Sequence, residues 1–340
     1  MKRLGHLYEQ IISVENLRRA DEKARRGKTS SYGVRCHDKN REANILALHE
    51  ALRTKTYRTS PYDVFKIYEP KERIIFRLPY YPDRIVHHAI MNVLEPIWVR
   101  TFTHNTFSCV KWRGIEGCAR YVDKCIKRFE GRPLYCLKID IKKFYPSIDH
   151  AALKRTVRRR LKDPDLLWLL DEIIDSAEGL PIGNYLSQYL ANLHLCYLMH
   201  RLNEVERVAV SEYADDICAF ADSKERLHEV LDVIREELGL LRLTLKGNYQ
   251  IFPVAENRYD RHGRAVDYVG YKFYRRQRLM RKGIKQNFCR ATARLNRERP
   301  LRDAKAYKQA VAPWLGWAKH SNSKNLLRTI INPKYYDSIL

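Results

Sequence analysis

Three carboxylates stand where strands of this chain should carry apolar side chains. Asp140 interrupts the apolar run 137–141, and Asp215 with Asp216 occupies the turn of the segment 211–221. Taken one at a time, they suit a strand-end cap and a solvated turn, both common uses of Asp. Together, on two adjacent strands, they could clamp two divalent cations about 3.5 to 4 Å apart for phosphoryl transfer. Mg²⁺ suits this chemistry, because it binds to a few carboxylates plus the phosphate oxygens of a substrate.

The charge of the chain indicates an acidic partner. Its 340 residues include 64 Lys+Arg against 40 Asp+Glu, a formal net charge of +24. With 45% hydrophobic and 31% charged residues, the composition is that of a globular protein. The charge therefore sits on a folded body and not on a disordered tail. At about 150 residues per domain, the length allows two or three units with cores of their own.

The cysteines and the termini exclude other classes of protein. Eight cysteines form no CxxC pair and no zinc-binding spacing, so we expect reduced, mostly buried thiols in a cytosolic protein. No apolar run follows the N-terminus, so we expect no signal peptide. Residues 179–200 have the length of a membrane span, but Pro181, Gly183 and Asn192 would place a helix breaker or polar groups in lipid. We expect a buried helix there.

The elements before Asp140 are predicted to be helices, apart from one β-hairpin. Residues 1–60 are predicted to be basic helices. The β-rich runs 62–70 and 73–81 predict a hairpin. An amphipathic helix should follow, beginning at Asp83.

The part of the chain that carries Asp140, Asp215 and Asp216 is predicted to alternate between strands and helices. From Leu134 onward, short strands interleave with packed helices, and one strand is predicted over 241–254. This pattern is typical of an α+β sheet with helices on one face. Beyond Asn287, three basic helices predict a separate small bundle, with Tyr307, Trp314 and Trp317 in its core.

An ordered series of motifs resembles the palm of reverse transcriptases. YADD at Tyr213–Asp216 follows DIKKFYPSIDH at Asp140–His150, and GLPIGNYLSQYLAN lies between them. DRIVHHAI and WRGIEGCA precede these blocks, and LTLKGN and DYVGYKF follow. YADD alone is a weak signal, whereas the ordered set is specific. The resemblance implies an α+β right-hand polymerase with fingers, a ferredoxin-like palm whose antiparallel sheet is backed by helices, and a helical thumb.

The resemblance also implies a division of the chain and an activity. The expected parts are a basic helical extension (1–60), fingers (61–133), a palm (134–275) with fingers-associated helices at 150–185, and a helical thumb (276–340). The activity would be RNA-directed DNA polymerisation, a nucleotidyl transfer from dNTPs. Two Mg²⁺ ions would serve as cofactors, with Mn²⁺ as a substitute. Template RNA and an RNA/DNA duplex would be partners, held by basic helices that neutralise phosphates.

Catalytic roles follow from the matched positions. Asp140 and Asp215 match the metal ligands, Asp216 matches the supporting carboxylate, and the carbonyl of Ile141 could be a further ligand. Tyr145 matches the aromatic gate that excludes a ribose 2′-OH, and an ordinary core aromatic is its alternative.

Nucleotide and primer contacts are implied in the same way. Cations on the hairpin would grip the triphosphate, and Lys246 matches a lysine proposed to protonate pyrophosphate, with a solvated strand end as its alternative. The expected nucleotide-binding residues are Lys71, Arg73, Arg77, Tyr145, Ile182, Gly183, Gln188 and Lys246, and the expected primer or template contacts are Tyr213, Val269, Gly270 and Tyr271.

One block indicates the subclass. In residues 181–188, Ile182 precedes the Gly and Gln188 follows Ser187, whereas retroviral and intron enzymes have Gln before the Gly and Pro after the Ser. The form here resembles reverse transcriptases of diversity-generating retroelements. Ile182 has no hydrogen-bonding group, so discrimination against mispairs should fall.

The subclass implies partners and has alternatives. It implies error-prone cDNA for mutagenic retrohoming, a bacterial or phage source, a cytoplasmic location with no membrane, and a small basic accessory variability protein that forms an oligomer. The alternatives are an antiphage defence polymerase that copies a noncoding RNA and a non-catalytic RNA-binding scaffold. The three carboxylates disfavour the scaffold, since they would repel RNA unless metal were bound.

Overall fold

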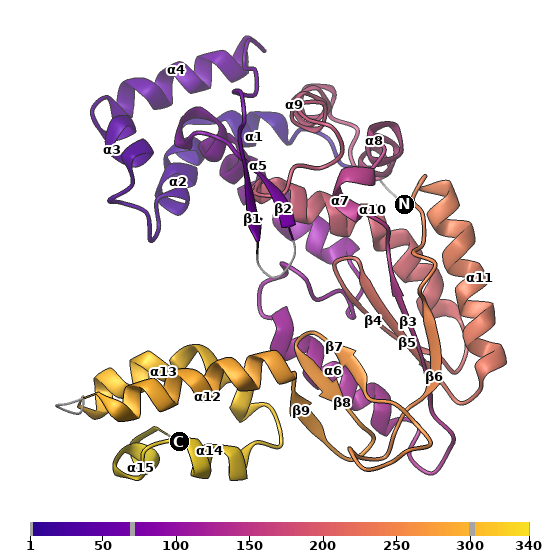
Figure 1. Cartoon of the computed structure of the whole chain (residues 1–340). Helices are drawn as coiled ribbons and strands as arrows, with labels where there is room; N and C mark the ends of the chain where they lie inside the picture. Colours follow the sequence, from indigo (N-terminus) through magenta and orange to yellow (C-terminus); the bar gives the residue numbers. More distant parts are fainter. Residues whose placement is uncertain (1–2, 69–71, 299–302, 340) are drawn as a thin grey trace. The chain divides into compact units, whose positions relative to one another are not determined.

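The structure, a computed structural model, describes residues 3–68, 72–298 and 303–339 (Figure 1). The chain forms two compact units. The first comprises Met1–Lys111, Asp140–Val205 and Asp232–Gly247. The second comprises Trp112–Ile139, Glu206–Leu231 and Asn248–Leu340.

The first unit is mainly helical. Its helices are α1 (Tyr8–Ile12), α2 (Val14–Ala24), α3 (Tyr32–Asp38), α4 (Arg41–Arg53), α5 (Ile85–Thr101), α7 (Phe144–Ser147), α8 (His150–Arg158), α9 (Pro164–Ile174) and α10 (Tyr185–Glu204). Local signals set several of these ends: the side chain of Ser13 caps α2, and Asp163 caps α9 one residue before Pro164. Helix α5 packs against α2 and α10.

Helix α10 confirms the buried helix expected within residues 179–200. Its apolar residues on all sides, among them Leu186, Leu193 and Met199, are almost fully buried. Across the three described stretches of the chain, no helix combines the length and apolar character needed to cross a membrane.

The predicted hairpin is confirmed, but the start predicted for the next helix is wrong. Strands β1 (Asp63–Tyr68) and β2 (Glu72–Arg77) pair antiparallel. Helix α5 begins at Ile85, after a π-helical turn, η1 (Tyr80–Arg84). Asp83 does not cap the helix because its carboxylate accepts hydrogen bonds from the Tyr57 hydroxyl (2.8 Å) and the Ser60 backbone (3.1 Å).

A four-stranded sheet has the order β4-β5-β3-β6, and its strand residues belong to the second unit except Asp140, the last residue of β3. Its strands are β3 (Tyr135–Asp140), β4 (Ala209–Tyr213), β5 (Asp216–Ala221) and β6 (Gln250–Pro253). Helix α6 (Gly114–Lys127) packs on β4. The pairs β4–β5 and β3–β6 are antiparallel, as the expected α+β class requires.

The strand predicted over 241–254 is wrong in extent. Only Gln250–Pro253 forms a strand of the sheet, while Leu245 makes a single bridge to Ile141. Helix α11 (Lys224–Leu240) ends directly before this segment, and Arg242 has a left-handed φ of 57°. Extended backbone therefore cannot begin at Leu241.

A small sheet and a helical bundle complete the second unit. Strands β7 (Val266–Tyr268), β8 (Tyr271–Phe273) and β9 (Arg278–Met280) precede α12 (Lys282–Arg297), α13 (Ala304–Lys319), α14 (Lys324–Ile330), η2 (Pro333–Tyr335) and α15 (Tyr336–Ile339). The predicted bundle core is confirmed in part by Tyr307, which is buried, and by Trp314, which stacks on Phe288 with centroids 5.9 Å apart. The bundle begins at Lys282, earlier than predicted.

The cysteines agree with the expectation of reduced thiols. All eight are free, and Cys118, Cys125, Cys136, Cys196 and Cys218 are buried.

Candidate active site

Strand β3 presents Asp140 at its end. Leu137 and Ile139 are buried, while Lys138 and Asp140 are half-buried. Because side chains alternate along a strand, Lys138 and Asp140 share one face of β3. The next strand in the sheet, β5, begins with Asp216.

One carboxylate oxygen of Asp140 is in an ion pair, and the other has no hydrogen-bond partner among the described residues. Its Oδ2 forms an ion pair with the Lys246 ammonium, and its carbonyl accepts a hydrogen bond from the Lys246 backbone (3.0 Å). Its Oδ1 is buried and has no hydrogen-bond partner within the described part of the chain. A buried carboxylate oxygen without a donor is costly. It is also the ligand type that Mg²⁺ prefers, so Asp140 fits a metal-binding role.

The hairpin between β4 and β5 projects Asp215. Tyr213 pairs with Asp216 across the sheet, so Ala214 and Asp215 form a two-residue turn. Ala214 has a φ of 56°, a left-handed conformation that Ala rarely adopts. Such strain persists where the surroundings fix it, and it is frequent at functional sites.

Two residues that sequence reasoning missed support this turn. The Tyr268 hydroxyl lies 3.0 Å from the Asp216 carbonyl and 3.2 Å from that of Ser211. The Lys138 ammonium lies 3.7 Å from a carboxylate oxygen of Asp216. Alternation along β3 could have identified Lys138, two residues before Asp140. Nothing in the sequence near Tyr268 indicates its contact with a turn more than fifty residues away.

The carboxylates predicted to bind metal do not form a complete metal-binding group by themselves. Within the described residues, no group of three or more His, Cys, Asp or Glu side chains is arranged to hold a metal ion by itself. Ile141 is buried, and its backbone bridges to Leu245. Mg²⁺ in phosphoryl-transfer sites uses one or two carboxylates plus substrate phosphates, which the residues here could supply.

The segment at Ile182 lies against the β1–β2 hairpin. The Phe76 backbone donates a hydrogen bond to the Ile182 carbonyl (2.8 Å). Gly183 has a φ of 122°, and a Cβ there would lie 2.5 Å from the Phe76 carbonyl oxygen. Only glycine permits this approach. Gln188 is exposed on α10.

Tyr145 is held by the chain that leads into this segment. The Leu180 backbone donates to the Tyr145 carbonyl (2.8 Å), and Gly179, with a φ of 62°, approaches the same carbonyl closely. The Tyr145 ring is half-buried and packs edge-on against Phe144, with centroids 5.4 Å apart. Tyr145 and Ile182 therefore belong to one packed region of the first unit.

The cations predicted on the β1–β2 hairpin differ in their ion pairing. Arg73 is exposed on β2 opposite Ile67. Arg77 is also exposed but forms an ion pair with Asp63. Lys71 lies outside the described residues.

The turn at Val269 and Gly270, which is predicted to contact the primer, is tight and largely buried. Tyr268 and Tyr271 pair across it, and Val269 and Gly270 have φ values of 39° and 83°. A Cβ at Gly270 would lie 2.4 Å from the Trp317 ring. The Tyr271 ring is buried against Trp317, with centroids 5.1 Å apart. Gly270 is also buried, so of the three residues predicted to contact the primer here only Val269 is partly exposed.

Known proteins resemble this chain over most of its length. Residues 69–272 match the family described as reverse transcriptase (RNA-dependent DNA polymerase). A 150-residue stretch is 27% identical to protein YkfC of Escherichia coli, and this match covers 40% of the chain and 39% of that protein. The structure of apo telomerase from Candida tropicalis superposes with a TM-score of 0.50 at 10% identity, over 80% of this chain and 58% of the telomerase chain. The likeness to telomerase is one of fold.

Proposed function

Since this chain belongs to the reverse transcriptase family, whose members are RNA-dependent DNA polymerases, we propose that it extends a DNA primer on an RNA template. The observation that carries the proposal is the open Oδ1 of Asp140 at the end of β3. The sheet order supports a joint role for Asp140, Asp215 and Asp216, because β3 and β5 are neighbours.

We propose that these three carboxylates hold two Mg²⁺ ions. When bound, such ions stabilise the attacking and leaving oxygens of an in-line displacement. The primer 3′-hydroxyl gives up its proton to solvent as its oxygen forms a bond to the α-phosphorus, and the bond from the α-phosphorus to the bridging oxygen breaks, so that pyrophosphate leaves with the electrons of that bond. Lys246, which forms an ion pair with Asp140, would stabilise the charge that develops on the pyrophosphate leaving group.

Side chains of the first unit would select the nucleotide. Tyr145 would exclude a 2′-hydroxyl, and Arg73 would contact the triphosphate as a charged donor. Arg77 suits this role less, because Asp63 already compensates its charge. Gly183 would let the backbone approach the nascent base pair closely.

The basic helices differ in their readiness to bind a duplex. On α12, Lys282, Lys285, Arg290, Arg294 and Arg297 are all exposed. On α2, Arg18 is paired with Glu42, and the neighbouring Arg25 with Asp21 and Asp38. We therefore propose α12 as the main phosphate-binding helix.

For the subclass we propose a diversity-generating retroelement enzyme that makes error-prone cDNA with an accessory protein oligomer. The support is the sequence of residues 181–188, with the apolar Ile182 before Gly183. A template repeat, a variable repeat and a small accessory reading frame in the neighbouring DNA would favour this subclass over antiphage defence.

Primer extension tests the polymerase proposal. With RNA template, DNA primer, dNTPs and Mg²⁺, Asp215→Asn should abolish extension while RNA binding persists. Asp232→Asn is the matched control, because Asp232 is exposed and, among the described residues, forms an ion pair with Arg235 on its own helix. Extension by Asp215→Asn at the rate of the control would overturn the assignment.

A further inference from the structure

The first unit holds a cavity that none of the proposed metal-binding carboxylates lines. Its volume is about 610 Å³, within the range of about 300–1,000 Å³ for small-ligand pockets. Its walls come from segments 28–37 and 77–84 and from Asn44 of α4. None of the described lining residues is Asp or Glu.

Two cations at the cavity have no acidic partner. Lys28 and Arg84 line it, and neither takes part in an ion pair between described residues. The Arg84 Nε is buried and makes no hydrogen bond with the described chain. Burial lowers the pKa of Arg84 and, together with the charge of Arg84, that of Lys28. An anion between the two would relieve this repulsion.

An exposed aromatic ring lines the same cavity as these cations. Tyr32, the first residue of α3, is 78% exposed. Gly33 follows it, and a Cβ there would lie 2.9 Å from the Cβ of Tyr80, so glycine lets α3 approach the opposite wall. Cations beside an exposed aromatic ring are the combination with which proteins hold unpaired nucleotides, since bases stack on the ring while phosphates meet the charges.

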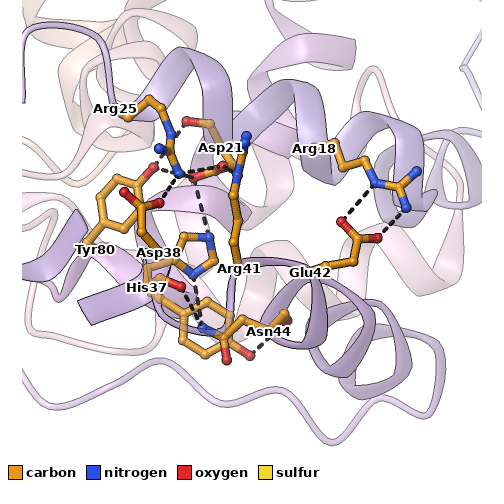
Figure 2. Close-up of polar contacts among 10 residues, drawn as sticks. Arg18, Asp21, Arg25, His37, Asp38, Arg41, Glu42, Asn44 and Tyr80 are labelled. Atoms are coloured by element: carbon orange, nitrogen blue, oxygen red, sulfur yellow. Dashed lines mark hydrogen bonds and ion pairs between the residues drawn. The ribbon is translucent and has the colours of Figure 1, made fainter. Parts of the chain in front are cut away.

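Polar contacts hold two of the lining residues, Tyr80 and His37, in place (Figure 2). Both point to the buried carboxylate of Asp21. Asn44 contacts the His37 ring (3.2 Å), and the Tyr81 hydroxyl donates to the Asn44 carbonyl (3.0 Å). Walls held this way need little ordering when a ligand binds.

We propose that this cavity binds one unpaired nucleotide, with its phosphate between Lys28 and Arg84 and its base on the Tyr32 ring. The nucleotide could come from a single-stranded RNA or from a free mononucleotide, which present the same base and phosphate. Arg77, one of the expected nucleotide-binding residues, also lines the cavity, but none of the proposed metal ligands does, so binding there requires no metal. The proposal therefore stands apart from polymerase activity.

The test uses the full chain without metal or dNTP. A labelled short oligouridine is titrated by fluorescence anisotropy and adenosine monophosphate by calorimetry, on wild type, Lys28→Gln, Arg84→Gln and Tyr32→Ala. Arg35→Gln is the charge control, since Arg35 is exposed on α3 but does not line the cavity. Tyr259→Ala is the aromatic control, because Tyr259 is 73% exposed and lies in the second unit.

We expect Tyr32→Ala to weaken ligand binding at least about fivefold. Lys28→Gln should lower the slope of log affinity for RNA against log salt by about 0.7, the loss of one single-strand phosphate contact. A loss seen only with RNA identifies RNA as the source, and a loss seen only with the mononucleotide identifies the free ligand. If Lys28→Gln and Tyr32→Ala, both at exposed positions, bind both ligands like their controls, the proposal is overturned.

Discussion

Asp21 and Asp140 both belong to the first unit, yet their carboxylates have opposite surroundings. Asp21 is fully buried and accepts hydrogen bonds from the Tyr80 hydroxyl, from Arg25 (2.9 Å) and from Arg41 (2.6 Å), as Figure 2 shows. Asp140 has one oxygen paired with Lys246 and one open. A carboxylate saturated by donors holds the fold together, whereas one left open is available for a ligand.

The environment of Asp21 also sets its charge. Burial alone would raise the pKa of Asp21, but hydrogen bonds from Tyr80, Arg25 and Arg41 lower it below its ordinary value. His37 lies 3.5 Å away, and burial lowers its pKa, so it stays neutral near pH 7. The buried site therefore keeps a carboxylate balanced by two arginines.

The largest expected effect is catalytic. Asp140→Asn should lower the rate of single-nucleotide incorporation by about 10³-fold or more, because loss of a metal ligand removes several kcal/mol of transition-state stabilisation. Stability should change by less than about 1 kcal/mol, since the lost ion pair with Lys246 is partly exposed. Rapid-quench incorporation and urea unfolding measure the two quantities. A large loss of stability with an intact rate would mean that Asp140 is structural, like Asp21.

The second prediction concerns Asp21. Asp21→Asn leaves Arg25 and Arg41 without their buried partner and should lower the free energy of unfolding by about 3–5 kcal/mol. The incorporation rate per folded molecule should stay unchanged. Urea unfolding checks the stability, and Arg41→Gln, at a partly exposed partner, provides a milder variant.

The control for Asp21 lies in the same view. Glu42→Gln breaks the exposed ion pair with Arg18 and should leave the urea midpoint nearly unchanged. Equal midpoints for Asp21→Asn and Glu42→Gln would show that burial of the carboxylate contributes little.

The role of Asp140 could be predicted from the sequence, whereas that of Asp21 could not. Asp140, Asp215 and Asp216 stood out because charge interrupts apolar strand patterns, and the hairpin, the buried helix and the helical bundle follow from local periodicity. Nothing marked Asp21, since its partners Tyr80, His37 and Arg41 come from separate elements. Contacts between distant segments leave no local pattern to read.

Of the two wrong predictions, the one at Asp83 has the same origin and the one at 241–254 has a local cause. Asp83 looked like a helix cap, but the distant Tyr57 and the nearer Ser60 bind its carboxylate. The short strand at 250–253 looked longer because apolar residues precede it, but helix α11 runs to Leu240 and Arg242 has a left-handed φ of 57°. The division into extension, fingers, palm and thumb stays a prediction, as do the roles of the site residues.

Lowering the pH should separate the contribution of Asp21 to stability from that of the buried histidines. Burial lowers the pKa of His87 and His194 to about 4. Between pH 6.5 and 4 the unfolded chain therefore binds more protons, and stability falls as the pH falls. The pKa of Asp21 is lowered instead, so its contribution is present above the unfolded value of about 4 and is lost below it.

Urea midpoints measured from pH 7 to pH 3 check this division. Down to about pH 4, Asp21→Asn should lose stability somewhat more steeply than wild type, because the charge of Asp21 raises the pKa of His37. Below that, wild type should lose an additional part that the variant lacks. Parallel curves over the whole range would remove Asp21 from the acid response.

The smallest expected effect concerns a position with no polar side-chain atom at all. Ile182 lies beside the hairpin, its carbonyl satisfied by the Phe76 backbone, while its side chain can neither donate nor accept a hydrogen bond. A mispair differs from a correct pair mainly in geometry, so an apolar wall at this place should tolerate distorted pairs. Asp140 has an unpaired oxygen that can accept a ligand, whereas the Ile182 side chain has no polar atom. A polar substitution at Ile182 should therefore add a hydrogen-bonding group.

Ile182→Gln is therefore expected to lower misincorporation while Mg²⁺-dependent synthesis continues. A difference of about 1.4 kcal/mol between correct and incorrect insertion changes the error ratio tenfold, so a single added hydrogen bond gives a measurable effect. Ile182→Leu is the matched control, because it alters shape without adding a donor or acceptor. Sequencing of cDNA made by the three proteins on one RNA gives the error spectra, with the largest change expected opposite template adenine. Identical spectra for Ile182→Gln and Ile182→Leu, or a wild type equally accurate at all four template bases, would contradict the role of Ile182 and favour the antiphage alternative.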